Sequence, residues 1–363
     1  MLMKRNRVPN AARKAVGLAL QGGGSWGAYT WGVLDALLAS RTVVIEQLSG
    51  TSAGAINAAI VASALAGGST KRAREALRSF WLSVAYPATE TVGAEVFAPV
   101  ERAWRESINA WLLSSGSSPY QLNPLGVNPL RELIARHVDI DALRSSRAPA
   151  LFVTLTNVRT GLPRIVANDA MSIDALIASA CLPQLFQAVE IDGEPYWDGG
   201  YSGNPSLWPM IHDGGARDLI VVQLVPDEVE AAPTDAYAIR RRVDEIVFNS
   251  SLVAEMQAIN ALRALADRSG GIDVIDTRLH RIGPPRAALL TQGSALERSR
   301  RWLLQLHDEG RAAARRFLAR HGASIGVRET LDIGRSFHGV PMTTVPRPAN
   351  EDLFDARRMS APR

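Results

Sequence analysis

Short apolar runs alternate with stretches of helical spacing along this chain, and that alternation constrains its fold most. The runs at 18–20, 43–48 and 218–225 are rich in aliphatic residues, and the first two are followed by helical periodicity at 28–38 and 53–65. Strands that alternate with helices are typical of a parallel sheet covered by helices. The sequence therefore predicts an α/β fold of three layers (α/β/α) with a mostly parallel central sheet.

Further elements are predicted from the same periodicities. Additional helices are expected at 71–84, 129–137, 173–181, 236–268 and 293–321. Ser172 is a good N-cap for the third of these, because its hydroxyl can accept a hydrogen bond from a free backbone N–H. Two runs rich in β-branched residues, 150–158 and 162–166, flank a Thr-Gly turn and predict a hairpin.

Composition excludes several classes of protein. The chain has 363 residues, of which 47% are hydrophobic, so it can bury a large core. Its 40 basic and 36 acidic residues are interspersed, which favours solvated helix faces over nucleic-acid binding. Cys181 is the single cysteine, which excludes an intramolecular disulfide and a multi-cysteine metal site. Its apolar neighbours predict a buried side chain.

The sequence pattern predicts neither a signal peptide nor a membrane-spanning segment. The N-terminus is basic but lacks the apolar segment of a signal peptide. The longest mostly apolar run, 55–67, is too short to cross a bilayer and indicates a buried helix. We therefore expect a cytoplasmic protein, with a charge that is compatible with a peripheral position at membrane surfaces.

The first glycine-rich loop has two interpretations. Gly22, Gly24 and Gly27 follow an apolar run and complete a G-x-G-x-x-G, the dinucleotide fingerprint between a strand and a helix. Glu46 lies roughly 20 residues further on, where that fingerprint expects an acidic residue. However, Glu46 precedes Leu48 inside a predicted strand, whereas the fingerprint residue should end its strand.

The second glycine-rich turn carries a serine at its centre. The predicted strand at 43–48 leads into Gly50-Thr51-Ser52-Ala53-Gly54, and a helix of small residues follows. A nucleophile on so sharp a turn needs small neighbours two residues away on either side, because larger side chains would collide. At the N-terminus of the helix, free N–H groups favour a developing oxyanion. The turn therefore predicts a nucleophilic serine, although a tight strand–helix connection would also need these glycines.

A serine nucleophile needs a proton acceptor, and the residues suggest a carboxylate. None of the six histidines has a context that points to a base, and His280, His307 and His321 are expected on the surface. Asp198 follows an apolar-aromatic strand end and precedes Gly199. Burial would raise its pKa and make it a better base, although Asp-Gly-Gly is also an ordinary turn. A Ser-His-Asp triad has no support in the sequence.

Three motifs in one order resemble a known family. They are G-G-G-x-x-G at Gly22–Gly27, G-T-S-A-G at Gly50–Gly54 and D-G-G at Asp198–Gly200. In this combination the chain resembles the patatin-like phospholipases over about residues 15–225, including the stretch Ser179–Pro183. The resemblance implies a patatin-like fold with the nucleophile elbow after the second strand, and hydrolysis of lipid esters by a Ser-Asp dyad.

The resemblance also implies a role for each motif residue. Ser52 would be the nucleophile that forms an acyl-enzyme, and Asp198 its general base. The backbone N–H groups of Gly22, Gly23 and Gly24 would form the oxyanion hole. The glycines that support these motifs are Gly27, Gly50, Gly54, Gly199 and Gly200. The implied partner is a lipid ester at a transiently contacted membrane surface, with no metal, cofactor or nucleic acid.

One position departs from the family pattern. Family members usually carry Arg or Lys immediately before the last glycine of the first loop, where this chain has Trp26. A cation there would bind an anionic headgroup or anchor the loop. Its absence argues against recognition of a phosphate headgroup and favours neutral lipid esters, lipid esters with uncharged headgroups, or other acyl esters as substrates.

Two alternative functions stay open at this point. One is a protein that binds NAD(P) or another nucleotide through the loop Gly22–Gly27. The other is a catalytically silent binding protein with the patatin fold, which the intact Ser52 and Asp198 disfavour. The sequence gives no indication of the oligomeric state.

One catalytic domain is predicted between two less regular ends. The predicted parts are a flexible basic N-terminus over 1–15, a patatin-like catalytic domain over 16–325, a cap or lid insertion within it over 87–127, a helical C-terminal part over 226–325 and a C-terminal tail over 326–363. Weak periodicity with Trp104 and Trp111 suggests the insertion, which would cover the site or hold an acyl chain. The helix around 295–320 is expected to pack in the core with a solvated Arg face, in preference to an interfacial position.

Overall fold

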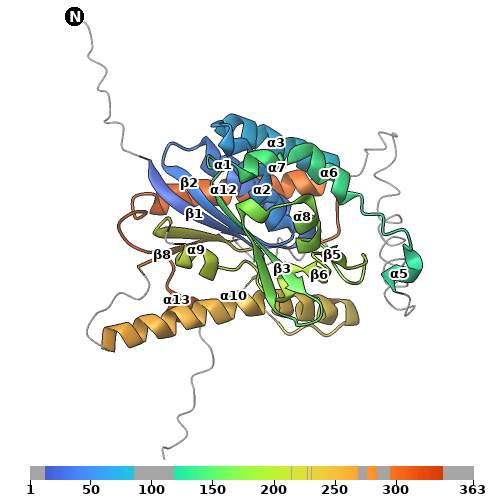
Figure 1. Ribbon diagram of the computed structural model, residues 1–363. Coiled ribbons are helices and arrows are strands. Elements are labelled where there is room, and N and C mark those ends of the chain that lie inside the picture. The colour runs from blue at the N-terminus through green and yellow to red at the C-terminus, as the bar shows by residue number, and fades with distance from the viewer. Residues whose placement is uncertain are drawn as a thin grey trace, which may run out of the picture.

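The structure is a computed structural model of the chain. It describes residues 13–85, 118–213, 215–226, 228–229, 231–268, 276–283 and 295–337. A central sheet lies between two layers of helices (Figure 1). The predicted three-layer α/β/α fold is therefore confirmed.

Parallel strands form the middle of the sheet. The described strands are β1 (Lys14–Leu20), β2 (Val43–Gly50), β3 (Ala150–Asn157), β4 (Pro163–Val166), β5 (Val189–Ile191), β6 (Glu194–Asp198), β7 (Asp218–Val222) and β8 (Arg278–Ile282). Their order is β5-β6-β3-β2-β1-β7-β8, with β4 also paired to β3. From β3 to β8 all neighbours are parallel, whereas β4, β5 and β6 form antiparallel pairs. The loops after β1 and β2 therefore meet at one edge of the sheet.

Most helices cover one face of the sheet (Figure 1). They are α1 (Gly27–Ala39), α2 (Ala53–Ala66), α3 (Thr70–Val84), α6 (Leu130–His137), α7 (Ile140–Arg144), α8 (Ile173–Ser179) and α12 (Arg300–His321). Helices α1 and α12 make the most extensive contact between two described elements. Glycine permits it, because a Cβ on Gly32 would lie only 1.9 Å from the backbone oxygen of His307.

The opposite face carries α9 (Trp208–His212), α10 (Ala236–Arg268) and α13 (Ile333–Ser336), with α10 running along the base of the molecule in Figure 1. The remaining short elements are α5 (Pro119–Leu122) and the 3-10 turns η1 (Gly24–Trp26), η2 (Asn168–Ala170) and η3 (Gly199–Tyr201). The turn η1 precedes α1, and η3 follows β6.

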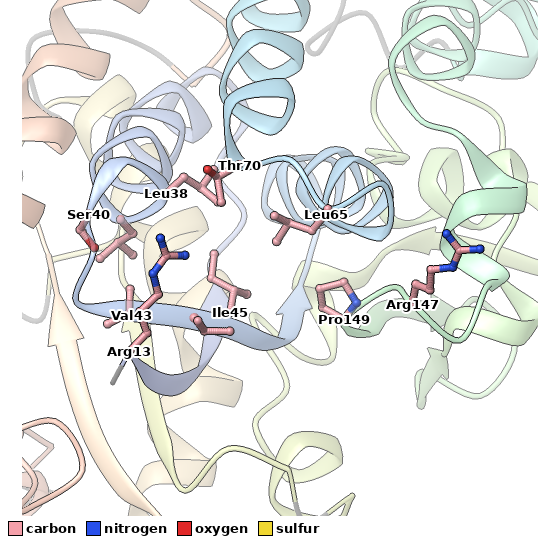
Figure 2. A pocket seen from close by; sticks show the side chains of 12 residues that line it. Arg13, Leu38, Ser40, Val43, Ile45, Leu65, Thr70, Arg147 and Pro149 are labelled. Carbon is pink, nitrogen blue, oxygen red and sulfur yellow. The ribbon is translucent and has the colours of Figure 1, made fainter. Parts of the chain in front are cut away.

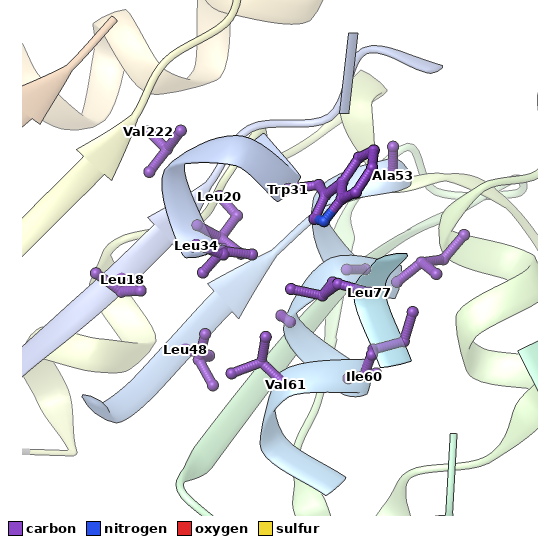
Figure 3. Close-up of a cluster of buried hydrophobic side chains, with 14 of the residues drawn as sticks. Leu18, Leu20, Trp31, Leu34, Leu48, Ala53, Ile60, Val61, Leu77 and Val222 are labelled. Atoms are coloured by element: carbon purple, nitrogen blue, oxygen red, sulfur yellow. The ribbon is translucent and has the colours of Figure 1, made fainter. Parts of the chain in front are cut away.

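Each face of the sheet has its own hydrophobic core. The larger core packs side chains of β1 and β2 against α1, α2 and α3 (Figure 3). Helix α12 contributes to the same core. The smaller core packs Leu219 and Val221 of β7 against Leu252 and Met256 of α10. Trp302, Leu306 and Phe317 of α12 are buried, which confirms the core position expected for this helix.

Local patterns predicted most of these elements, and the hairpin of β3 and β4 is confirmed. Ser172 caps α8 as expected, because its Oγ accepts a hydrogen bond from Ala175 N at 3.0 Å. The helix predicted from residue 293 begins instead at Arg300, where Ser299 is the N-cap. The edge strand β8 was missed because its charged residues weaken the apolar signal.

The strand predicted over 218–225 ends earlier, at Val222. The N–H groups of Leu224 and Val225 donate to the side-chain Oε1 of Gln21, at 2.7 and 2.8 Å. The backbone of these two residues therefore bonds to the side chain of Gln21, directly after β1, and does not continue the strand pairing. Within the described ranges, no helix is both long and apolar enough to span a membrane.

Candidate active site

Ser52 lies on a strained turn between β2 and α2. Its backbone has φ 55° and ψ −124°, a conformation that non-glycine residues rarely adopt. The flanking glycines make the turn sterically possible. A Cβ on Gly50 would lie 2.6 Å from Gly54 O, and one on Gly54 would lie 2.2 Å from Leu20 O. The turn thus has the geometry of a nucleophile elbow.

Hydrogen bonds to residues far away in the sequence hold the elbow in place. Ser52 N donates to Ser179 Oγ at 3.0 Å, and Ser179 Oγ donates to Thr154 O on β3 at 2.8 Å. Thr51 Oγ1 donates to Gly203 O at 2.6 Å. The elbow is therefore connected both to the neighbouring strand and to the segment that follows Asp198.

Asp198 ends β6 and is fully buried. Its Oδ1 accepts a hydrogen bond from Gly200 N at 2.8 Å. Its Oδ2 has no hydrogen-bond partner in the described part of the chain. Burial raises the pKa of this carboxyl group to about 7, and the Gly200 N–H and the Ser52 hydroxyl partly offset the increase.

Ser52 and Asp198 are neighbours in the structure. The Ser52 hydroxyl is close enough to lower the pKa of Asp198, although the two make no hydrogen bond of good geometry. Such bonds are often long in unliganded sites and shorten when substrate binds. Oδ2 is therefore the oxygen of this carboxyl group that is left without a hydrogen-bond partner among the described residues.

The glycine-rich loop packs directly on the elbow. A Cβ on Gly22 would lie 2.8 Å from the Cβ of Ser52, so only glycine allows this approach. Gly22 N already donates to Asn204 Oδ1 at 2.6 Å. Among the hydrogen bonds of the described residues, none uses the N–H of Gly23 or Gly24. Gly24 has φ +57°, a left-handed conformation that favours glycine.

The glycines after Asp198 are also required by close contacts. A Cβ on Gly199 would lie 2.0 Å from Thr154 O, and one on Gly200 would lie 2.2 Å from Cε1 of Phe248. Gly27, which begins α1, faces Ala53 at the start of α2, and a Cβ there would lie 2.7 Å from that side chain. The three motifs therefore pack against one another.

The histidines lie elsewhere among the described residues. His280 and His307, expected on the surface, are buried: His280 has no exposed area and bonds Asp218 at 3.0 Å, while His307 contacts Asp35 at 3.7 Å. The surface position predicted for His280 and His307 is therefore wrong. Arginines near them in the sequence suggested exposure, but each histidine contacts a buried carboxylate from another element. No described histidine hydrogen-bonds to Ser52 or Asp198, and His338 lies outside the described residues.

Trp26 is buried in the larger core, with 6% of its surface exposed. Its ring packs under Gly23, whose Cβ position would lie 3.3 Å from Trp26 Cε3. Trp26 therefore contacts the loop through its ring and brings no charge to this position. The preference for neutral lipid esters stays a prediction.

Nucleotide binding finds no support in this geometry. Ser25 N donates to Ala295 O at 2.7 Å, and a Cβ on Gly24 would lie 2.3 Å from the same oxygen. The N–H of Ser25 is thus occupied by Ala295, whereas a pyrophosphate at the N-terminus of this helix would need it free. Glu46 is exposed on β2 and does not end the strand.

Two surface cavities are lined by other residues. One, of about 210 Å³, lies at the starts of β2 and β3, where Arg13, Val43 and Pro149 line it (Figure 2). The other, of about 240 Å³, lies between α1, α3 and α12. Ser52 follows the opposite end of β2, so neither cavity is the candidate site. The described residues contain no group of three potential metal ligands.

The predicted cap falls mostly outside the described residues, including Trp104 and Trp111. Its last part is described: Asn123 O accepts from Gln187 Nε2 at 2.6 Å, and Tyr120 OH accepts from Ala188 N at 3.3 Å. This part of the chain therefore contacts the segment between α8 and β5.

Fold and site together define a class: a three-layer α/β protein with a serine elbow and a buried carboxyl group beside it. The sequence pattern of the patatin-like phospholipase family matches residues 18–211, more than half of the 363-residue chain. This chain therefore belongs to the patatin-like phospholipase family, which supports the hydrolysis of lipid esters in general.

Comparisons with solved structures and with curated proteins do not narrow the function further. Among solved structures, VipD from Legionella pneumophila is similar to this chain, with 14% identity and a TM-score of 0.41. The similarity covers 85% of this chain and 67% of that one. A search of curated proteins finds no match.

Proposed function

We propose that this chain hydrolyses the carboxylic ester bonds of phospholipids or related lipid esters through a dyad of Ser52 and Asp198. The observation that carries the proposal is the buried Asp198 beside a serine on a strained elbow. Burial brings the pKa of this carboxyl group to about 7, and a general base works best when its pKa is near the working pH. A carboxyl group with an ordinary pKa would be a much weaker proton acceptor.

In the first step, Ser52 Oγ attacks the carbonyl carbon of the ester, and its proton passes to Asp198 Oδ2. The tetrahedral intermediate carries its negative charge on the former carbonyl oxygen. Because Asn204 occupies the Gly22 N–H, we assign the oxyanion hole to the N–H groups of Gly23 and Gly24. Donors that are fixed before reaction stabilise such a charge strongly.

Collapse of this intermediate breaks the bond to the alcohol, which leaves with the proton from Asp198. The acyl group is then bonded to Ser52 Oγ. Asp198, ionised again, takes a proton from water, and the resulting hydroxide attacks the acyl carbon. The second intermediate collapses to the free acid, and Ser52 recovers its proton from Asp198.

A fluorophosphonate probe and a panel of lipid esters test this proposal together. We expect the probe to label the wild-type chain and the chain to release fatty acid from at least one lipid ester. The panel should contain anionic, zwitterionic and neutral lipids, because the expected preference for neutral esters is measured by the same assay. Absence of labelling combined with tight NAD(P) binding would contradict the proposal.

The pH dependence of kcat/KM should follow the ionisation of the Asp198 carboxyl group. The group acts as a base only when ionised, so we expect kcat/KM to rise with pH through about 7 and to level off above. Initial rates on a soluble ester between about pH 5 and pH 9 measure this profile. A profile that stays flat through neutral pH would argue against Asp198 as the base.

A further inference from the structure

A buried asparagine connects the glycine-rich loop to α10. Asn204 is fully buried and lies six residues after Asp198. Its Oδ1 accepts from Gly22 N at 2.6 Å, and its Nδ2 donates to Phe248 O at 2.9 Å. The first partner can only donate and the second can only accept, so the orientation of the side-chain amide is determined by its neighbours.

The backbone of Asn204 is bonded as well. Its N–H donates to Ser251 Oγ at 3.0 Å, and its carbonyl oxygen accepts from Gln21 Nε2 at 3.3 Å. Gln21 Nε2 also donates to Asn249 Oδ1 at 3.0 Å. The residues just before the glycine-rich loop are therefore held by α10 and by the segment that carries Asn204.

We propose that Asn204 is a positioning residue for the oxyanion hole. By accepting a hydrogen bond from Gly22 N, Asn204 fixes the first peptide of the three-glycine stretch Gly22–Gly24. Without this bond the three glycines would have wide conformational freedom, because they have no side chains. The next two N–H groups, of Gly23 and Gly24, are then held in place for the oxyanion. This inference rests on the proposed function, since it assigns a role within that site.

The same short segment links all three parts of the site. Asp198 supplies the base, Gly203 O accepts from Thr51 Oγ1 of the elbow at 2.6 Å, and Asn204 binds the loop. A shift in Asn204 would move the oxyanion donors relative to the nucleophile. Loss of one oxyanion donor typically costs about 10²- to 10³-fold in kcat, and displaced donors should have a comparable effect.

Asn204→Leu tests the role, because leucine has a similar size but cannot accept the Gly22 N–H. Asn168→Leu is the matched control: its Oδ1 also accepts a backbone N–H, from Leu151 at 2.6 Å, and its Nδ2 donates to Leu143 O at 2.9 Å, at the other end of β3 from the site. We expect Asn204→Leu to lower kcat by about 10²-fold with KM changed less than about threefold. The control should keep kcat within about threefold. Asn204→Ser carries the same expectation if the leucine variant does not fold.

A transition-state comparison separates positioning from general loss of structure. A trifluoromethyl ketone analogue of the ester forms an oxyanion adduct with serine, whereas an uncleavable ether analogue does not. We expect Asn204→Leu to weaken the ketone by about the same factor as kcat and to leave ether binding unchanged.

Equal loss of kcat in the Asn204 and Asn168 variants, or equal weakening of both analogues, would overturn the positioning role alone. A wild-type chain that neither hydrolyses lipid esters nor reacts with fluorophosphonate would overturn the proposed function, and the role of Asn204 with it. The two failures are thus distinguishable.

Discussion

Ser52→Ala is expected to lower kcat on lipid esters by at least about 10⁴-fold and to abolish labelling by fluorophosphonate. Without Oγ no acyl-enzyme can form, and the residual rate comes only from binding and the oxyanion donors. The fold should persist. The hydroxyl of Ser52 makes no capping hydrogen bond to α2, and its N–H can still donate to Ser179 in the variant. Ester hydrolysis and probe labelling measure the loss, and thermal unfolding checks the fold.

Ser63→Ala provides the matched control. Ser63 is a buried serine on the same helix, and its Oγ donates to Ile60 O at 3.2 Å. This variant should keep its labelling and its turnover, because Ser63 lies three turns along α2 from the elbow. Undiminished hydrolysis by Ser52→Ala would show that the nucleophile is a different residue.

The sequence predicted the parts of this protein that depend on local patterns. Most strand and helix periods, the N-cap Ser172 and the turn between Gly50 and Gly54 each involve neighbouring residues, so composition and spacing are sufficient to place them. The close approaches of Gly22 to Ser52 and of Gly199 to Thr154 explain why these glycines stand out in the sequence.

Contacts between distant residues could not be predicted in this way. Ser179 binds the N–H of Ser52 from a different helix, and Asn204 binds Gly22 from 182 positions away. An isolated Ser or Asn carries no pattern that names its partner. The burial of His280 follows from Asp218 and Thr330, which bond its two ring nitrogens from other segments. Arginines nearby in the sequence pointed instead to the surface.

Asp198 was suggested by its aromatic neighbours, but only its position in the sheet explains the burial of its carboxyl group. It ends the strand β6, which pairs with β3 beside the elbow. Complete burial, with a single backbone N–H as a strong partner, raises the pKa to about 7. The same burial that suits a base therefore destabilises the ionised group in the folded state.

Asp198→Asn is expected to lower kcat by about 10²- to 10⁴-fold. Asparagine has the same shape and its Oδ1 can still accept from Gly200 N, but it cannot take a proton from Ser52. Steady-state rates and the rate of fluorophosphonate labelling should both fall. If Asp198→Asn retained activity while alanine at one histidine removed it, a Ser-His pair would replace the dyad.

The same variant should be at least as stable as the wild type at neutral pH. The pKa of Asp198 is about 3.8 in the unfolded chain and about 7 in the folded one. Between these values the folded state binds more protons, so the wild type loses stability as pH rises from about 4 to about 7, and its stability then levels off. Asparagine does not ionise, so the melting temperature of Asp198→Asn relative to wild type should increase over this range.

Glu255→Gln separates this effect from catalysis. Glu255 is a half-buried carboxyl group whose pKa desolvation also raises to about 7, but it accepts from Leu207 N and Trp208 N at the start of α9. Glutamine can still accept these bonds, so this variant should show a similar pH-dependent gain in stability and nearly full activity. If both variants lost activity equally, the loss in Asp198→Asn would be a general effect of removing a desolvated carboxylate. If only Asp198→Asn loses activity, catalysis depends on the carboxylate that lies beside Ser52.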